Sequence, residues 1–378
     1  MKRLAVTSLA LSGMLAAVSF RTAGAAEQTA PVRIDDQGTV HITDFAIPLS
    51  SYMSAPARKE FIEGTRDPGD PAWGQPDAPI EKLRAMYEAG SQELLKQAQA
   101  RYAVNIEPRD IGGVHTKVVT PKAGVPADNK HRVLIELHGG GFFTGGNGQA
   151  LVESVPVAAT GGFEVVAVDY REGPENKYPA ATEDVAAVYK ALLRDHKPAQ
   201  IGLYGCGAGG TLSAMAVAWF QKERLPRPGA VGIFSAGAYG NFDAPPGVPG
   251  SWGGDSRYTA PPLTGDTLLP PDPSKTLVLP RVMGVYLREA NLSDPLVSPG
   301  LYPDVLAKFP PTLVLTSTRG FDMSAAVQTH RELVKAGVDA RLHVWDGLSL
   351  CFFNSVDLPE SQEAFTVMTQ FFDHHLGK

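Results

Sequence analysis

The chain has 378 residues, of which 34 are Lys or Arg and 40 are Asp or Glu, so its formal net charge at pH 7 is -6. This composition is that of an ordinary globular protein and excludes a disordered, collagen-like or disulfide-rich chain. A chain of this length buries most of the surface that its unfolded form exposes. Because the net charge is negative and no stripe of basic residues with interleaved aromatics occurs, we expect no nucleic-acid partner.

The first 25 residues differ from the rest of the chain. Lys2 and Arg3 precede an apolar stretch over residues 4–20, and small residues follow at 23–25. This order is typical of a secretory signal peptide, so we expect residues 1–25 to be removed and the protein to be exported, to the periplasm or the medium. Polar residues interrupt the apolar stretch, which disfavours a membrane anchor. We therefore expect no membrane span in the mature protein.

The remainder is predicted to form an N-terminal segment over 26–103 and a core over 104–378. The segment is irregular to about residue 75, and apolar spacing then predicts one amphipathic helix over 80–102. In the core, short apolar runs that fit buried parallel strands lie at 133–137, 165–168, 201–204, 231–234, 313–316 and 342–345. Helical patterns lie at 182–196, 210–222, 324–335 and 362–376.

This alternation predicts an α/β fold, a doubly wound sheet with helices on both faces. The regularity fails between about residues 238 and 300, where Pro-rich stretches occur. We interpret this region as an insertion near the carboxyl edge of the sheet. Ligand pockets of open α/β sheets lie at that edge.

Two glycine-rich segments follow predicted strands. Residues 138–142 read His-Gly-Gly-Gly-Phe, and backbone N–H groups in such a run can point into a pocket without interference from Cβ atoms, as in an oxyanion hole. A tight turn is the alternative interpretation. The oxyanion hole is favoured because residues 205–210, Gly-Cys-Gly-Ala-Gly-Gly, run from a strand into a helix, which is the context of a nucleophile elbow.

These motifs resemble those of the α/β-hydrolase fold, specifically the hormone-sensitive-lipase-like carboxylesterases. The glycine run is similar to that family's oxyanion loop. Other segments similar to family motifs are 169–184, 293–299 and 341–347. The resemblance extends from about residue 104 to the C-terminus. It implies a mostly parallel eight-stranded sheet with helices on both faces, and a cap formed by the N-terminal segment together with the insertion.

The resemblance also locates the family's catalytic triad, and all three positions are substituted. The elbow pattern Gly-x-Ser-x-Gly has Gly207 at the nucleophile, the Thr-Arg-Asp pattern of the acid ends in Gly320, and the base position holds Leu350. Nucleophilic ester hydrolysis needs a hydroxyl, a base and an orienting acid. These vestigial positions supply none of them. The chain is therefore predicted to be a pseudoenzyme of the esterase and lipase type.

The oxyanion donors are not side chains, so they survive these substitutions. The resemblance assigns them to the backbone N–H groups of Gly140, Gly141 and Ala208. A pocket for a small acyl or ester ligand is therefore predicted. Neither a metal-ligand cluster nor a nucleotide-binding fingerprint occurs in the sequence, and we expect no cofactor and no metal.

A few other residues are candidates to replace the triad. Cys206 is an alternative nucleophile, but using it would put Tyr204 where the sharp turn needs a small residue, and its side chain should point away from the oxyanion hole. Ser349 lacks an orienting motif, and Asp322 is interpreted as a helix-start acid. None of the nine histidines falls in the expected loop, and His138 is a structural residue in the family.

The two cysteines, Cys206 and Cys351, adjoin the nucleophile and base positions, so the fold should bring their loops together. We expect two buried free thiols. A disulfide is the alternative, and it requires Cα atoms about 4.4–6.8 Å apart.

Three hypotheses remain open after these observations. The first is a pseudoenzyme that binds an acyl or ester ligand, and the second is a working hydrolase that uses Cys206, Ser349 or Asp322. The third is a scaffold without a small-molecule ligand. Fold alone does not decide between them. The sequence predicts neither the ligand's identity nor the oligomeric state.

Overall fold

The computed structural model describes residues 48–66, 78–240 and 285–377, with residue 36 and two short strands near the N-terminus. Those strands, β1 (Arg33–Ile34) and β2 (Val40–His41), pair antiparallel within a first unit, Met1–Pro48. The second unit is Leu49–Lys378. The predicted signal peptide at 1–25 and most of the predicted insertion, residues 241–284, lie outside the described residues.

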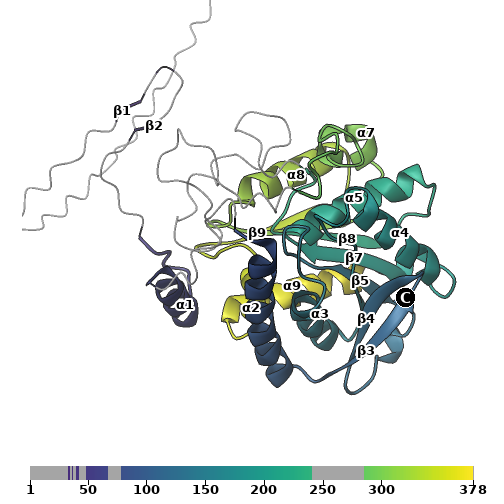
Figure 1. The fold of residues 1–378 in the computed structure, drawn as a ribbon, viewed down its shortest axis with the longest axis horizontal. Coiled ribbons are helices and arrows are strands. Elements are labelled where there is room, and N and C mark those ends of the chain that lie inside the picture. Colours follow the sequence, from purple (N-terminus) through teal and green to yellow (C-terminus); the bar gives the residue numbers. More distant parts are fainter. Residues whose placement is uncertain are drawn as a thin grey trace, which may run out of the picture. The chain divides into compact units, whose positions relative to one another are not determined.

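The second unit is built on an eight-stranded sheet in the order β10-β9-β8-β7-β5-β6-β4-β3 (Figure 1). The strands are β3 (Val104–Ile111), β4 (Val114–Pro121), β5 (Val133–Leu137), β6 (Glu164–Val168), β7 (Ile201–Cys206), β8 (Ala230–Phe234), β9 (Thr312–Ser317) and β10 (Ala340–Trp345). Strands β10 to β6 are parallel, and β4 pairs antiparallel with both β6 and β3. The predicted mostly parallel eight-stranded sheet is confirmed.

Helices cover both faces of this sheet, as predicted. The α-helices are α1 (Ala55–Arg66), α2 (Ile80–Arg101), α3 (Gly148–Gly161), α4 (Ala180–Leu192), α5 (Ala208–Lys222), α7 (Pro303–Leu306), α8 (Met323–Lys335) and α9 (Pro359–His375). Short 3-10 helices are η2 (Ala127–Asn129), η3 (Pro198–Gln200), η4 (Pro299–Leu301) and η5 (Phe352–Asn354). Helices α4, α5 and α8 cover one face of the sheet, and α2, α3 and α9 cover the other (Figure 1). Their buried side chains belong to two separate core clusters, one on each face.

Three α-helices, α1, α3 and the four-residue α7, were not predicted. Helix α1 lies in the segment expected to be irregular. Helix α3 was missed because all its residues from Gly148 to Ala158 are buried, so the amphipathic period of a surface helix is absent. Its internal Pro156 also argues against a helix at the level of sequence. The omission matters because α3 carries a side chain of the candidate site.

The side chains of β5 point alternately to the two faces of the sheet, and this alternation places a carboxyl group near the candidate site. Val133, Ile135 and Leu137 join the core on the α4 and α5 side, while Leu134 joins the core on the α3 side. Because successive strand residues point to opposite faces, Glu136 also points toward α3, where it is fully buried. A carboxyl group therefore lies within an apolar core, one residue before the strand ends.

Among the described helices, none is long and apolar enough to cross a bilayer.

Candidate functional site

The sharp turn between β7 and α5 has the backbone of a nucleophile elbow. Gly207 adopts φ 57° and ψ -117°, and its N–H donates to the carbonyl of Phe234 at 2.9 Å. The flanking glycines are required by close packing against β5. A Cβ on Gly205 or Gly209 would lie 2.1 or 1.6 Å from the carbonyl oxygen of Leu137. The elbow is thus built against the end of the strand that leads into the glycine run.

The nucleophile position itself is vacant. Within 4 Å of a Cβ built on Gly207, the sulfur of Cys351 is the nearest described atom, at 4.0 Å. A side chain would therefore fit, but its backbone would be strained at a cost of about 1–3 kcal/mol. Gly207 avoids that cost and offers no hydroxyl.

The glycine run forms a left-handed loop at the end of β5. Gly140, Gly141 and Phe142 all have positive φ, of 109°, 63° and 62°. The ring of Phe142 is buried and stacks on Tyr286 at a centroid distance of 4.9 Å. Arg84 of α2 donates to the carbonyl of Phe143 at 2.7 Å. The loop is therefore fixed from both sides.

The backbone amides assigned as oxyanion donors lie on this loop and at the start of α5. Among the described residues, no acceptor takes a hydrogen bond from the N–H of Gly140, Gly141 or Ala208. A buried or half-buried amide without a partner is costly, and a carbonyl or carboxylate oxygen of a ligand would satisfy it. The geometry is compatible with the predicted donor role.

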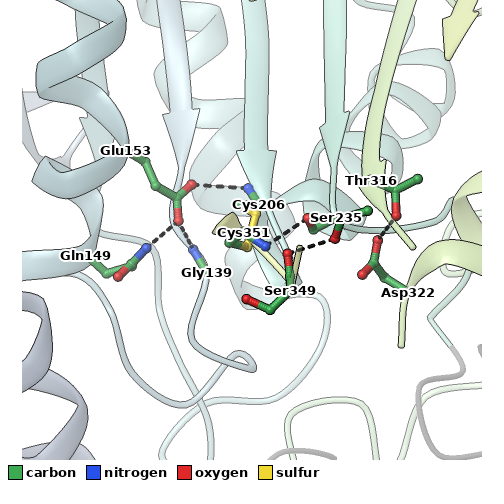
Figure 2. The surroundings of a disulfide bond; sticks show 10 residues. Gly139, Gln149, Glu153, Cys206, Ser235, Thr316, Asp322, Ser349 and Cys351 are labelled. Atoms are coloured by element: carbon green, nitrogen blue, oxygen red, sulfur yellow. Dashed lines mark hydrogen bonds between the residues drawn. A yellow bond between two sulfur atoms is a disulfide. The ribbon is translucent and has the colours of Figure 1, made fainter. Parts of the chain in front are cut away.

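Glu153 of α3 ties the glycine run to the elbow, as Figure 2 shows. Its Oε1 accepts from the N–H of Gly139 at 3.0 Å and from Nε2 of Gln149 at 2.8 Å. Its Oε2 accepts from the N–H of Cys206 at 3.1 Å. Sequence reasoning missed this residue because α3 was not predicted. The signal that could have identified it is a single acid within the otherwise apolar stretch 150–158.

Glu153 and two other buried titratable groups, Glu136 and His138, lie at this connection. Burial shifts the pKa of each in the direction that favours its neutral form. Burial raises the pKa of Glu153 to about 7, and it raises the pKa of Glu136 well above its usual range, with a further contribution from the charge of Glu153. Burial lowers the pKa of His138 to about 4. The His138 ring stacks on Tyr170 at 4.0 Å, and its Nδ1 lies 2.8 Å from the carbonyl of Gly139. His138 therefore holds the loop as a neutral imidazole.

The variant Glu153→Gln is expected to flatten the pH dependence of stability between about pH 4.5 and 7. Folded Glu153 keeps its proton up to a pKa of about 7, whereas the unfolded chain releases it near the ordinary pKa of 4.5. The folded state then binds more protons, so rising pH lowers the free energy of unfolding across this range. Because Gln does not titrate, urea unfolding should show the gap between variant and wild type changing by about 1–3 kcal/mol over the range.

A matched control for this experiment is Glu136→Gln. The pKa of Glu136 is likewise raised well above its usual range by burial, which favours its neutral form in the folded protein, and an amide imitates that form. In the unfolded chain Glu136, too, loses its proton at a lower pH than in the folded protein. Glu136→Gln should therefore remove only the part of the pH dependence of stability that Glu136 contributes, and the part contributed by Glu153 should remain. His138 is present in all three proteins and cancels from the differences. If the free energies of unfolding of Glu153→Gln and of the wild type changed in parallel with pH, the assignment of a raised pKa to Glu153 would be wrong.

At the predicted acid position, a neighbouring carboxylate occupies the space of the missing side chain. A Cβ on Gly320 would lie only 2.2 Å from Oδ1 of Asp322. Asp322 is fully buried, and its Oδ2 accepts from the Thr316 hydroxyl at 2.6 Å (Figure 2). It is the N-cap residue of α8, as predicted for a helix-start acid, but its side chain makes no hydrogen bond that caps the helix. Its carboxylate points inward because Thr316 at the end of β9 supplies a buried donor.

The predicted base position, Leu350, is half-buried against the core on the α3 and α9 side. Its neighbour Ser349 uses its backbone carbonyl to accept from the Ser317 hydroxyl at 2.8 Å (Figure 2). Asp346, at the end of β10, is exposed and accepts from Thr318 at 2.8 Å. These contacts fix the loop, but they bring no base toward Gly207.

Cys206 and Cys351 form a disulfide (Figure 2). The prediction of two free thiols is wrong, because the loops after β7 and β10 bring the two Cα atoms to 6.2 Å, within bonding range. Cys351 has a positive φ of 49°, and its N–H donates to the Ser235 hydroxyl at 2.9 Å. In this state Cys206 has no thiol, so it is not the nucleophile of a working hydrolase.

Comparison with known proteins gives one consistent picture. Residues 134–354 match the model of a family described as alpha/beta hydrolase fold. An acetyl-hydrolase of Streptomyces hygroscopicus is 34% identical over 106 residues, which cover 28% of this chain and only 36% of that relative.

Solved structures resemble a larger part of the chain. The crystal structure of an esterase, E25, aligns with a TM-score of 0.73 and 27% identity, covering 89% of this chain and 99% of that one. An esterase from the bacterial hormone-sensitive lipase family aligns with a TM-score of 0.69 and 24% identity, covering 86% and 99%, and shows the shared fold. The chain belongs to the alpha/beta hydrolase fold family, as predicted, and its resemblance to esterases extends over most of its length.

Proposed function

We propose that this protein is an exported pseudoenzyme that binds a small acyl or ester ligand and does not hydrolyse it by the serine, acid and histidine route. One observation carries the proposal. Gly207 keeps the backbone of a nucleophile elbow, beside amides free to hold a carbonyl oxygen, yet it has no side chain. Similar proteins are named esterase and acetyl-hydrolase, and these names support an acyl or ester compound as the ligand.

The alternative is an active carboxylesterase-type hydrolase with a non-standard nucleophile, and it is less well supported. The disulfide removes the Cys206 thiol. Asp322 is buried and accepts a hydrogen bond from Thr316. A serine hydroxyl such as that of Ser349 also needs a base within hydrogen-bond reach, and Leu350 stands at the position where the resemblance puts one.

Two observations support export. Residues 1–25 have the order of charge, apolar stretch and small residues that is typical of a signal peptide. The Cys206–Cys351 disulfide is the kind of bond that persists in oxidising compartments.

Ligand binding tests the proposal against a scaffold without a ligand. Thermal unfolding is measured with increasing butyrate and phenyl acetate, and a ligand at about 100 times its Kd stabilises the folded state by about 2.7 kcal/mol. Gly207→Phe should abolish the stabilisation by filling the space beside the amides. Gly207→Ala is the matched control, since it carries the same backbone strain without the bulk. No stabilisation of the wild type by any acyl compound of a graded chain-length series would contradict the proposal.

A further inference from the structure

The disulfide brings a sulfur atom to the vacant nucleophile position. Among the described atoms, the Sγ of Cys351 is the closest to a Cβ built on Gly207, at 4.0 Å, which is ordinary van der Waals contact. The sulfur thus lies next to the place where a serine hydroxyl would stand. It comes from the loop that carries the predicted base position, so the substituted site holds a potential nucleophile on its opposite side.

The two sulfurs of the bond are not equivalent. Cys206 is completely buried below the elbow, whereas Cys351 is 9% exposed. The N–H of Cys351 donates to Ser235, and the N–H of Cys206 donates to Glu153, so each backbone stays anchored when the bond between the sulfurs is broken. We expect reduction to leave Cys351 beside Gly207.

The place beside Cys351 is the start of a helix. Gly207 is the residue before α5, a helix of 15 residues, and the first amides of a helix favour the negative charge that develops on a carbonyl oxygen under attack. The same amide of Ala208 is one of the three donors available to a carbonyl oxygen.

We propose that, in the reduced protein, Cys351 is a latent nucleophile that accepts acyl groups from small carboxylic esters or thioesters. The disulfide silences this activity. The inference rests on the proposed acyl-binding site for placement of the carbonyl, but it adds a residue, a reaction and a redox condition. Cys206 is the partner that masks the thiol.

The steps balance as follows. A dithiol reductant gives two electrons to the disulfide, becomes a disulfide itself, and leaves thiols on Cys206 and Cys351. Cys351 loses its proton to solvent, and its sulfur forms a bond to the carbonyl carbon of the ester. The resulting oxyanion is held by the amides of Gly140, Gly141 and Ala208. Collapse breaks the carbon–oxygen bond, the alcohol leaves with a proton from water, and a thioester remains on Cys351.

The experiment compares the oxidised and reduced full-length protein after brief exposure to p-nitrophenyl acetate. Intact mass and peptide mapping then locate the acetyl groups. In the reduced protein we expect one acetyl group on Cys351, added at least about tenfold faster than in the same protein unfolded in guanidinium, because the folded site positions the carbonyl. The oxidised protein should gain no thioester.

Two variants form a matched pair. Cys206→Ala leaves Cys351 as a free thiol and should be acetylated without reductant, at the rate of the reduced wild type. Cys351→Ala leaves Cys206 free and should stay unmodified. If Cys206→Ala does not fold, the peptide map of the reduced wild type decides. Acetylation of Cys206, or a rate on Cys351 equal to that of the unfolded chain, would overturn the inference.

Competition by butyrate separates this inference from the proposed function. If butyrate stabilises the oxidised protein but Cys351 stays unreactive after reduction, the latent nucleophile is wrong and the ligand site stands. If Cys351 is acetylated rapidly but butyrate neither binds nor slows the reaction, the thiol is reactive and the proposed ligand site is wrong.

Discussion

Restoring the missing side chains is expected to turn this chain into an esterase, with a rise in kcat/KM of at least about 10³-fold. The variant carries Gly207→Ser, Gly320→Asp and Leu350→His. At position 207 the backbone already has φ 57° and ψ -117°, and a Cβ meets only ordinary contacts. A fourth change, Asp322→Ala, is needed because a Cβ at position 320 would lie 2.2 Å from Oδ1 of Asp322.

Hydrolysis of p-nitrophenyl acetate and butyrate measures this effect. The same variant with alanine in place of serine at 207 is the control, and it should stay at the level of the wild type. The three-residue variant, which keeps Asp322, should be weaker than the four-residue variant because the two carboxylates compete for one space. Robust turnover by the unmodified protein would show that the pseudoenzyme proposal is wrong.

The central strands β5 to β9 were predictable because nearly all their residues are buried, whereas β3 and β4, which have exposed residues, were not predicted individually. A parallel strand under helices appears in sequence as a short unbroken apolar run, and β5 matches its predicted range, Val133–Leu137. The amphipathic α2 was equally visible. Helix α3 was not, since burial on all sides removes the contrast between faces that reveals a helix.

The site was predictable in its backbone and not in its side-chain contacts. Glycine spacing and family resemblance located the loop at 138–142 and the elbow at Gly207. The inward turn of Asp322 depends on a hydroxyl from β9, and the role of Glu153 depends on a helix from a different part of the chain. Such contacts are set by tertiary packing, which local patterns do not encode.

The disulfide could not be predicted from the sequence for the same reason. Fold resemblance brought the loops of Cys206 and Cys351 near each other, but bonding also depends on the Cα separation and on the direction of each side chain. Both are consequences of the elbow and of the positive φ at Cys351. Proximity predicted from topology was therefore insufficient to choose between two thiols and one bond.

Removing this bond is expected to lower the free energy of unfolding by about 4–5 kcal/mol, near the upper end of the range for a single disulfide. The bond joins residues 145 positions apart, so it closes a long loop and removes much of the unfolded chain's freedom. Urea unfolding of the wild type with and without reductant measures the loss.

The double variant Cys206→Ala and Cys351→Ala separates the bond from the reductant, since its stability should match the reduced wild type and should not respond to reductant. The oxidised protein should also unfold with a smaller dependence on urea, because a cross-linked unfolded chain exposes less surface. Equal free energies of unfolding for the oxidised and reduced wild type would mean that strain in the folded state offsets the constraint on the unfolded one. Reduction would then expose Cys351 at no cost in stability, and the bond would act on the thiol's reactivity alone.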